Sequence, residues 1–355
     1  MADLWLHDYQ IAVLQHQNLV TQLALHQIQA RRRRRRRRRR PQVPRAIWVR
    51  PWISRRRQFG KYDQLLVELR KEDQRAFKNF LRMPPEMYDE LVQRVGPRIT
   101  KQRTWYREPL DPGLKIAITL RHIASGTKYA AMKFGCRVPH NTQSLAVREV
   151  CQAIIDEYLD EAMTCPTTPE GWREIQISSW RSGTSHIPVV PLMGFYSIVL
   201  MALVDADYKF LWADVGSPGA SPDAQIYNES ELREMAEDGT IGFPAPDPLP
   251  NDYKDVPYFF VVDDAFGLRK HTMKRYTLRG LTDLEKIFNY RLSRARRVVE
   301  NAFGILANRF QILLTTMQHH PSTVKIIVKA CIVLHNLMRT RYPTEMSPKE
   351  MTENW

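Results

Sequence analysis

The stretch Phe259-Phe-Val-Val-Asp-Asp-Ala-Phe266 decides the fold, because an apolar run ends there abruptly in two carboxylates. Such a run is typical of a short buried strand that carries Asp263 and Asp264 to the edge of a sheet. Glu300 lies inside a long helical pattern over 289–313. A strand end and a helix can bring acidic groups together, and such groups can hold the divalent metals that cut phosphodiesters. These residues therefore favour nucleic acid as the substrate.

The hydrophobic pattern divides the chain into four parts. Residues 1–57 form a basic tail, and 58–165 have helical spacing throughout. Over 170–342 the period changes, with a β-hairpin predicted within 195–215 and helices on either side of the strand that ends in the carboxylates. A short tail, 343–355, follows. We expect an α/β domain behind an all-α region.

The positive charge is concentrated in the N-terminal tail. The formal net charge is +15, and residues 1–57 hold fifteen Arg against Asp3 and Asp8, which gives +13 and leaves +2 for the rest. After a weak helical pattern over 1–28, ten consecutive arginines at 31–40 repel one another and predict disorder. This run is either a phosphate-binding or nuclear-import arm or a solvated low-complexity insertion, and the pattern favours neither.

Residues 129–158 have the layout of a helix-turn-helix. A short helix and a turn precede a second helix, which Asn141 or Thr142 would cap. In such a unit Gln143 and Arg148 would face a DNA groove. Three packed helices of an all-α subdomain explain the same spacing, and spacing alone favours that plainer interpretation.

Composition points to a soluble intracellular protein. The N-terminus lacks the basic and apolar regions of a secretory signal, and no window of transmembrane length is free of charge, so no membrane partner is expected. The four cysteines form no Cys-x-x-Cys pair. Cys136, His140 and Cys151 could bind zinc, but ordinary reduced thiols are the favoured interpretation.

Together these motifs resemble those of the PIF/Harbinger transposases and the nucleases domesticated from them. The matching segments are 194–207, 219–225, 262–266, 297–303 and 333–336. The resemblance spans about 45–342 and implies an RNase H-like catalytic domain behind a helical, helix-turn-helix-like DNA-binding region. It also implies nuclear location, DNA as substrate, Mg²⁺ or Mn²⁺ as cofactor, and a separate DNA-binding partner protein.

The resemblance assigns roles to particular acids. In that family, metal-binding acids lie on the first strand, at a helix start that matches Asp223, at the strand end that matches Asp263, and on the helix that matches Glu300. These three are the candidate catalytic and metal-binding residues. Arg296 and Arg297, one turn before Glu300, are candidate nucleic-acid contacts. On pattern alone they would instead form a salt bridge with Glu300, whereas the resemblance favours a ligand role for the acid.

The stretch 175–193 departs from the family pattern, because it contains no Asp or Glu where the first-strand acid is expected. It looks like a deletion of the first catalytic strand. The first acid in such sites bridges two metals about 4 Å apart, so its loss would cripple cleavage. Two functions stay open: a Harbinger-type divalent-metal nuclease that lacks one acid, and a non-catalytic nuclear DNA-binding or scaffold protein.

Overall fold

The computed structural model describes residues 49–343. Within this range it leaves out 106–107, 183–185, 188, 193–197, 249–252 and 278, and it does not describe the side chains of 176–197. The chain divides into two compact units, Met1–Ser54 and Arg55–Trp355. The first unit contributes only the short helix α2 (Pro51–Ser54) to the described elements.

Three features predicted for the tails lie outside the described residues. They are the weak helix over 1–28, the arginine run over 31–40 and nearly all of the C-terminal tail. The inner end of the basic tail is described, and it corrects the predicted boundary at 57. Residues assigned there to a disordered tail form α2 and the start of α3 (Arg56–Phe59).

The helical region consists of α3 and six longer helices. These are α4 (Leu65–Glu72), α5 (Gln74–Leu81), α6 (Pro85–Ile99), α7 (Pro112–Ser125), α8 (Tyr129–Cys136) and α9 (His140–Ala162). Local sequence sets the helix ends. The Asp111 carboxylate accepts from Leu114 N (3.1 Å) before Pro112 opens α7, and Gly126 ends that helix in the left-handed conformation (φ 63°).

One mixed sheet forms the centre of the second half of the chain. Its strands are β1 (His186–Ile187), β2 (Val189–Leu192), β3 (Ile198–Val204), β4 (Phe210–Pro218), β7 (Phe260–Val262) and β8 (Thr272–Met273). The hairpin β3–β4 is antiparallel, as predicted. β1 runs antiparallel to β3 and parallel to β7, and β7 runs parallel to β8. The strand order is therefore β4-β3-β1-β7-β8, while β2 continues β1 along β3. A separate pair, β5 (Asp247–Pro248) and β6 (Asp255–Val256), lies off this sheet.

The stretch 175–193 is not a deletion of the first strand, and that prediction is wrong. Its beginning belongs to α10 (Pro169–Ser182), and its end supplies β1 and β2. Both strands follow one register against β3, with His186 opposite Val204 and Leu192 opposite Ile198. The strand between β3 and β7 is present, and only its acid is missing.

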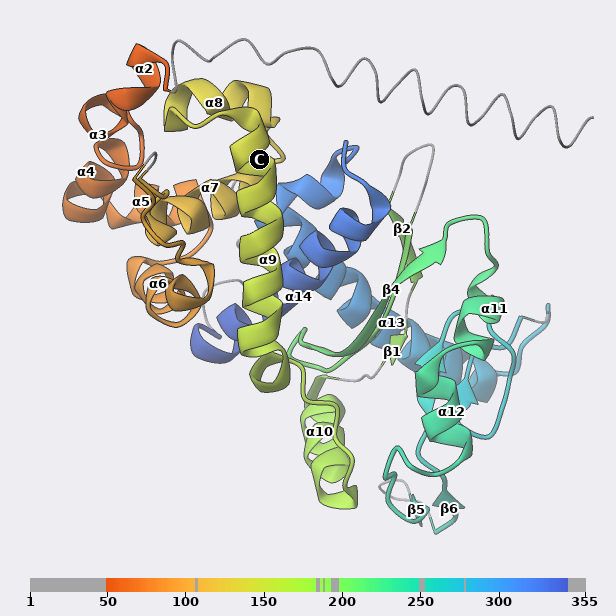
Figure 1. The fold of residues 1–355 in the computed structure, drawn as a ribbon. Coiled ribbons are helices and arrows are strands. Elements are labelled where there is room, and N and C mark those ends of the chain that lie inside the picture. Colours follow the sequence, from red (N-terminus) through yellow and green to blue (C-terminus); the bar gives the residue numbers. More distant parts are fainter. Residues whose placement is uncertain are drawn as a thin grey trace, which may run out of the picture. The chain divides into compact units, whose positions relative to one another are not determined.

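Helices cover both faces of the sheet (Figure 1). On one face Leu200 and Ala202 of β3 join a core with α13 (Asp283–Arg309) and α14 (Pro321–Arg341), which the 3-10 helix η1 (Gln311–Leu314) connects. On the other face Val199 and Met201 pack with α10, α11 (Asp223–Asn228) and α12 (Glu231–Glu237). The alternation along β3 thus separates the two cores.

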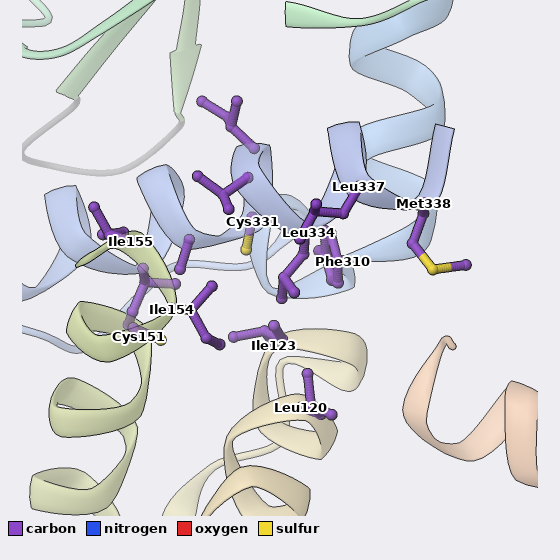
Figure 2. Packing of buried hydrophobic residues seen from close by; sticks show 14 of the residues in the cluster. Leu120, Ile123, Cys151, Ile154, Ile155, Phe310, Cys331, Leu334, Leu337 and Met338 are labelled. Atoms are coloured by element: carbon purple, nitrogen blue, oxygen red, sulfur yellow. The ribbon is translucent and has the colours of Figure 1, made fainter. Parts of the chain in front are cut away.

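The helical region and the sheet share a single core through α14. Cys151 and Ile154 of α9 lie against Cys331 of α14, and Ile123 of α7 closes the cluster (Figure 2). The boundary predicted near 165–170 therefore does not separate two cores. By length and composition α14 would also suit a membrane span, but 72% of that window is buried inside the protein, as in the core helix of a globular domain.

The end of α14 holds the β3–β4 hairpin. His335 Nε2 donates to Tyr208 O (2.8 Å) and Arg339 Nε donates to Asp207 O (2.9 Å). Within the turn, the Asp205 carboxylate accepts from Asp207 N (2.9 Å) and Lys209 N (2.8 Å). The Asp205 side chain therefore stabilises the turn.

Candidate active site at the end of β7

Asp263 leaves the end of β7 on the side that faces α13. In β7 the side chains of Phe260 and Val262 belong to the core with α10–α12, whereas Val261 packs with Leu292 and Ala295 of α13. Because strand residues alternate, the next residue on the α13 side is Asp263. Asp264 points elsewhere and pairs with Arg275 Nη2 (2.6 Å), so the two neighbouring acids occupy different surroundings.

Arg296 of α13 bridges two of the candidate acids. Its Nη1 lies 2.9 Å from Asp263 Oδ1 and its Nη2 3.1 Å from Asp263 Oδ2. The same Nη2 is 3.8 Å from Glu300 Oε1, one turn further along the helix. The predicted alternative of a salt bridge to Glu300 is therefore formed by Arg296, although the stronger pair is with Asp263. The Glu300 side chain is 63% exposed, so this second pair contributes little to stability.

Asp223 completes the group of candidate acids from the far side of β7. It is the first residue of α11 and is half-buried. Burial, and then the negative charge of Asp263, raise the pKa of Asp223, because both disfavour the ionised carboxylate. Asp263 is thus close enough to Asp223 to act on its pKa. The Asp263 side chain also contacts Arg296. Asp263 is the centre of the group.

The cationic side of the site consists of two arginines. A hydrogen bond to Asp264 is the main cause that raises the pKa of Arg275, and the charges of Asp263 and Glu300 act in the same direction. Arg296 lies between Asp263 and Glu300. A guanidinium that binds a carboxylate at two points is a strong and directional partner. The arrangement is a compensated ion cluster of acids and arginines.

A divalent metal does not fit the residues as they are arranged. In the described part of the chain, no three His, Cys, Asp or Glu side chains lie close enough together to hold a metal ion. The guanidinium group of Arg296 takes the place beside Asp263 that a metal cation would need. The neighbouring strand β1 has no acid to add, because the stretch 175–193 contains no Asp or Glu. Two-metal hydrolysis needs carboxylates that bridge the ions, so no cleavage step follows from this geometry.

Of the two candidate nucleic-acid contacts on α13, one forms ion pairs with acids of the site and the other is exposed to solvent. Arg296 is held by Asp263 and Glu300, so its predicted contact with DNA competes with these acids. Arg297 is exposed, and it makes no ion pair with any residue that the structure describes. Arg296 and Arg297 are adjacent in sequence, but successive residues of a helix point in different directions. Arg296 therefore faces the acids, whereas Arg297 faces solvent.

At the start of α9 the structure contradicts the exposed position predicted for Gln143, while the DNA contact predicted for Arg148 stays a prediction. α8 and α9 are joined by a short turn, as predicted, but Pro139 is the N-cap of α9 and no side chain caps it. Gln143 is completely buried, and its Nε2 donates to Val138 O (2.8 Å). A side chain without exposed surface cannot read a base, so the assignment of Gln143 to DNA is wrong. Arg148 is exposed.

The exposed face of α9 contains Arg148, as expected, but not Gln143. Asn141, Leu145, Arg148 and Gln152 are exposed at helical spacing. Gln143 shares its face with the buried Val147 and Val150, which follow it by four and seven residues. That spacing is visible in the sequence, so the periodic pattern could have identified Asn141 and excluded Gln143.

The second half of the chain is similar to a known family. Residues 191–336 match the family model described as DDE superfamily endonuclease. The match begins in β2, ends at Asn336 of α14 and contains Asp223, Asp263 and Glu300. It supports a DDE-type, transposase-derived nuclease domain, and such endonucleases generally use divalent metals. No curated protein and no solved structure matches this chain.

Proposed function

We propose that this chain is a transposase-derived nuclear protein of the PIF/Harbinger type that binds DNA and cleaves it poorly or not at all. The similarity of 191–336 to DDE superfamily endonucleases supports the transposase origin. The strand order β4-β3-β1-β7-β8 supports an RNase H-like catalytic fold, because it joins an antiparallel hairpin to parallel strands that end at the candidate acids.

One observation carries the proposed loss of cleavage. Arg296 neutralises Asp263 and contacts Glu300, while the neighbouring strand β1 brings no acid to the same sheet edge. A nuclease of this type would use Asp223, Asp263 and Glu300 to hold Mg²⁺ or Mn²⁺. Here the acids are balanced by arginine and one of the expected carboxylates is absent, which favours binding over catalysis.

DNA binding is proposed to rest on α9 and the basic tail. α8, the turn and α9 have the order of a helix-turn-helix unit, in which the start of the second helix meets the major groove. Asn141 and Arg148 are exposed there, and amide and guanidinium groups are the side chains that read adenine and guanine. The proposal includes a separate DNA-binding partner, as in the resembling family, which would add specificity that α9 alone does not supply.

A cleavage and binding assay tests this proposal. The full chain is incubated with supercoiled plasmid and either Mg²⁺ or Mn²⁺, and its affinity for duplex DNA is measured in parallel, with Glu300→Gln as the matched variant. We expect submicromolar to micromolar DNA binding and no nicking by either protein. Robust metal-dependent nicking that Glu300→Gln abolishes would show an intact nuclease, and absence of DNA binding would refute the proposed function.

A further inference from the structure

The exposed face of α13 carries an uncompensated run of positive charge that ends at the candidate site. Residues 286–299 contain five cationic residues and no acidic one. Lys286 pairs with Asp283 (2.9 Å) and Arg296 with Asp263. The other three, Arg291, Arg294 and Arg297, are exposed and make no ion pair with a described residue. These three residues define the arginine face of α13.

The spacing of the arginine face makes it a continuous patch. Its members follow one another by three residues, which on an α-helix is a rise of about 4.5 Å and a rotation of about 60° per step. The three guanidinium groups therefore cover about 9 Å of the helix length on one side. Like charges at this spacing repel one another, so an anionic ligand that contacts all three would relieve the repulsion.

The buried stripe of α13 that adjoins the arginine face fixes this patch in place. Leu292, Ala295 and Val298 are buried, and the first two pack against Val261 of β7. The helix that carries the arginine face therefore packs against β7, the strand that ends at Asp263. Arg297 precedes Glu300 by three residues, so the patch leads along the helix to the acids.

We infer that the arginine face of α13 binds the phosphate backbone of duplex DNA and guides it to the Asp263–Glu300 site. Guanidinium groups bind phosphate oxygens through a fixed fork of donors, and a polymer with regularly spaced charges can engage several of them at once. The exposed ring of Tyr290, on the preceding turn, adds an amphipathic contact beside the charges. This inference rests on the proposed DNA-binding function. It adds the path that the DNA backbone would follow along α13 to the candidate site.

The test compares two triple variants of the full chain with equal loss of charge. The first is Arg291→Gln/Arg294→Gln/Arg297→Gln. The matched control is Lys71→Gln/Arg75→Gln/Lys329→Gln, at exposed positions of other helices. Affinity for a random duplex is measured across a NaCl series, and thermal unfolding confirms that both variants fold.

The expected result is a change in the salt dependence of binding for the first variant only. Each neutralised phosphate contributes about −0.9 to the slope of log K against log salt, so three lost contacts should reduce the slope by about 2.7 and weaken binding at 0.1 M salt on the order of 100-fold. The control should keep a slope within about one of the wild type.

Three outcomes would overturn the inference. An unchanged slope in the first variant, or an equal change in the control, would show that the arginine face is not a specific contact. Competition by polyglutamate as effective as that by DNA would assign the face to an acidic polypeptide instead. If the wild type binds no DNA, the proposed function itself fails, whereas an unchanged first variant on a DNA-binding wild type refutes only the arginine face.

Discussion

Asn336 makes both backbone hydrogen bonds of Phe210, a residue that precedes it by 126 positions. Phe210 N donates to Asn336 Oδ1 (2.9 Å), and Asn336 Nδ2 donates to Phe210 O (2.8 Å). The same Nδ2 donates to Ala162 O at the end of α9 (2.9 Å). One buried amide on α14 therefore joins the start of β4 to the last residue of the helical region.

The first prediction is that Asn336→Ala destabilises the whole molecule. The substitution removes the partner of the two buried backbone groups of Phe210 and of the half-buried carbonyl of Ala162, and each buried group left unpaired costs about 1–3 kcal/mol. We expect a loss of about 3 kcal/mol in the free energy of unfolding, measured by urea denaturation. Asn141→Ala, at an exposed position, should change it by less than about 0.5 kcal/mol. Equal effects of the two substitutions would contradict the role given to Asn336.

A second prediction concerns acid stability. Burial, then the charge of Arg309, lowers the pKa of His335 from its ordinary value of 6.5 to about 3. The unfolded chain therefore binds a proton between pH 6.5 and 3 that the folded chain excludes, so this residue makes unfolding easier as the pH falls through that range. The pKa of His122 is lowered to about 4 by burial and acts in the same direction.

The contribution of His335 can be isolated by substitution. Asp205 acts in the opposite direction, because burial raises its pKa to about 6, so the total pH profile mixes several groups. The difference between wild type and His335→Gln removes these common contributions. We expect the variant to be less stable than the wild type at pH 7. Below pH 6.5, however, the free energy of unfolding of the variant should fall less steeply than that of the wild type, by about 1.4 kcal/mol per pH unit. Parallel profiles from pH 7 to pH 5 would show that His335 does not exclude the proton.

The third prediction concerns the arginine that occupies the acid cluster. Arg296→Gln removes the partner of Asp263 and leaves the carboxylates to repel one another, which favours a bound cation. We expect Mn²⁺ to bind at least about tenfold more tightly than to the wild type, a gain of about 1.4 kcal/mol, by isothermal titration calorimetry. Arg297→Gln carries the same change of charge at the adjacent, exposed position and should behave as the wild type. Equal affinities in all three proteins would show that Arg296 does not exclude a metal.

The elements around Asp263 follow from sequence pattern, whereas the contacts among them do not. The apolar run before Asp263, the hairpin and the long helix with Glu300 have clear periodicity, and all three are found. β1 was missed because a two-residue strand has no alternation to detect, and its partners Val204 and Val261 are distant in the chain. The bridge from Arg296 to Asp263 likewise depends on how α13 packs on β7, which no local pattern specifies.

A fourth prediction is that exposed and buried side chains of α9 have different roles, the exposed ones in DNA sequence recognition and the buried ones in stability. Asn141→Ala/Arg148→Ala removes two exposed side chains, so it should reduce the preference for a specific site over random duplex more than it reduces total affinity. Gln143→Ala removes a buried side chain that holds Val138 O, so it should lower stability and leave sequence preference unchanged. Binding selection with random oligonucleotides, followed by affinity measurement, provides the test. Equal losses on specific and random duplexes would favour plain helix packing over DNA recognition.

The last prediction is that an acid on β1 restores activity to the candidate site. The register places His186 opposite Val261 and Ile187 opposite Val262, directly before Asp263. Successive strand residues face opposite sides, so one of His186→Asp and Ile187→Asp brings its carboxylate to the side of Asp263 and Glu300. We expect Mn²⁺-dependent nicking of plasmid by that variant, none by the other, and loss of the gain when Glu300→Gln is added. If neither variant nicks DNA more than the wild type does, the missing first acid is not what limits cleavage in this chain.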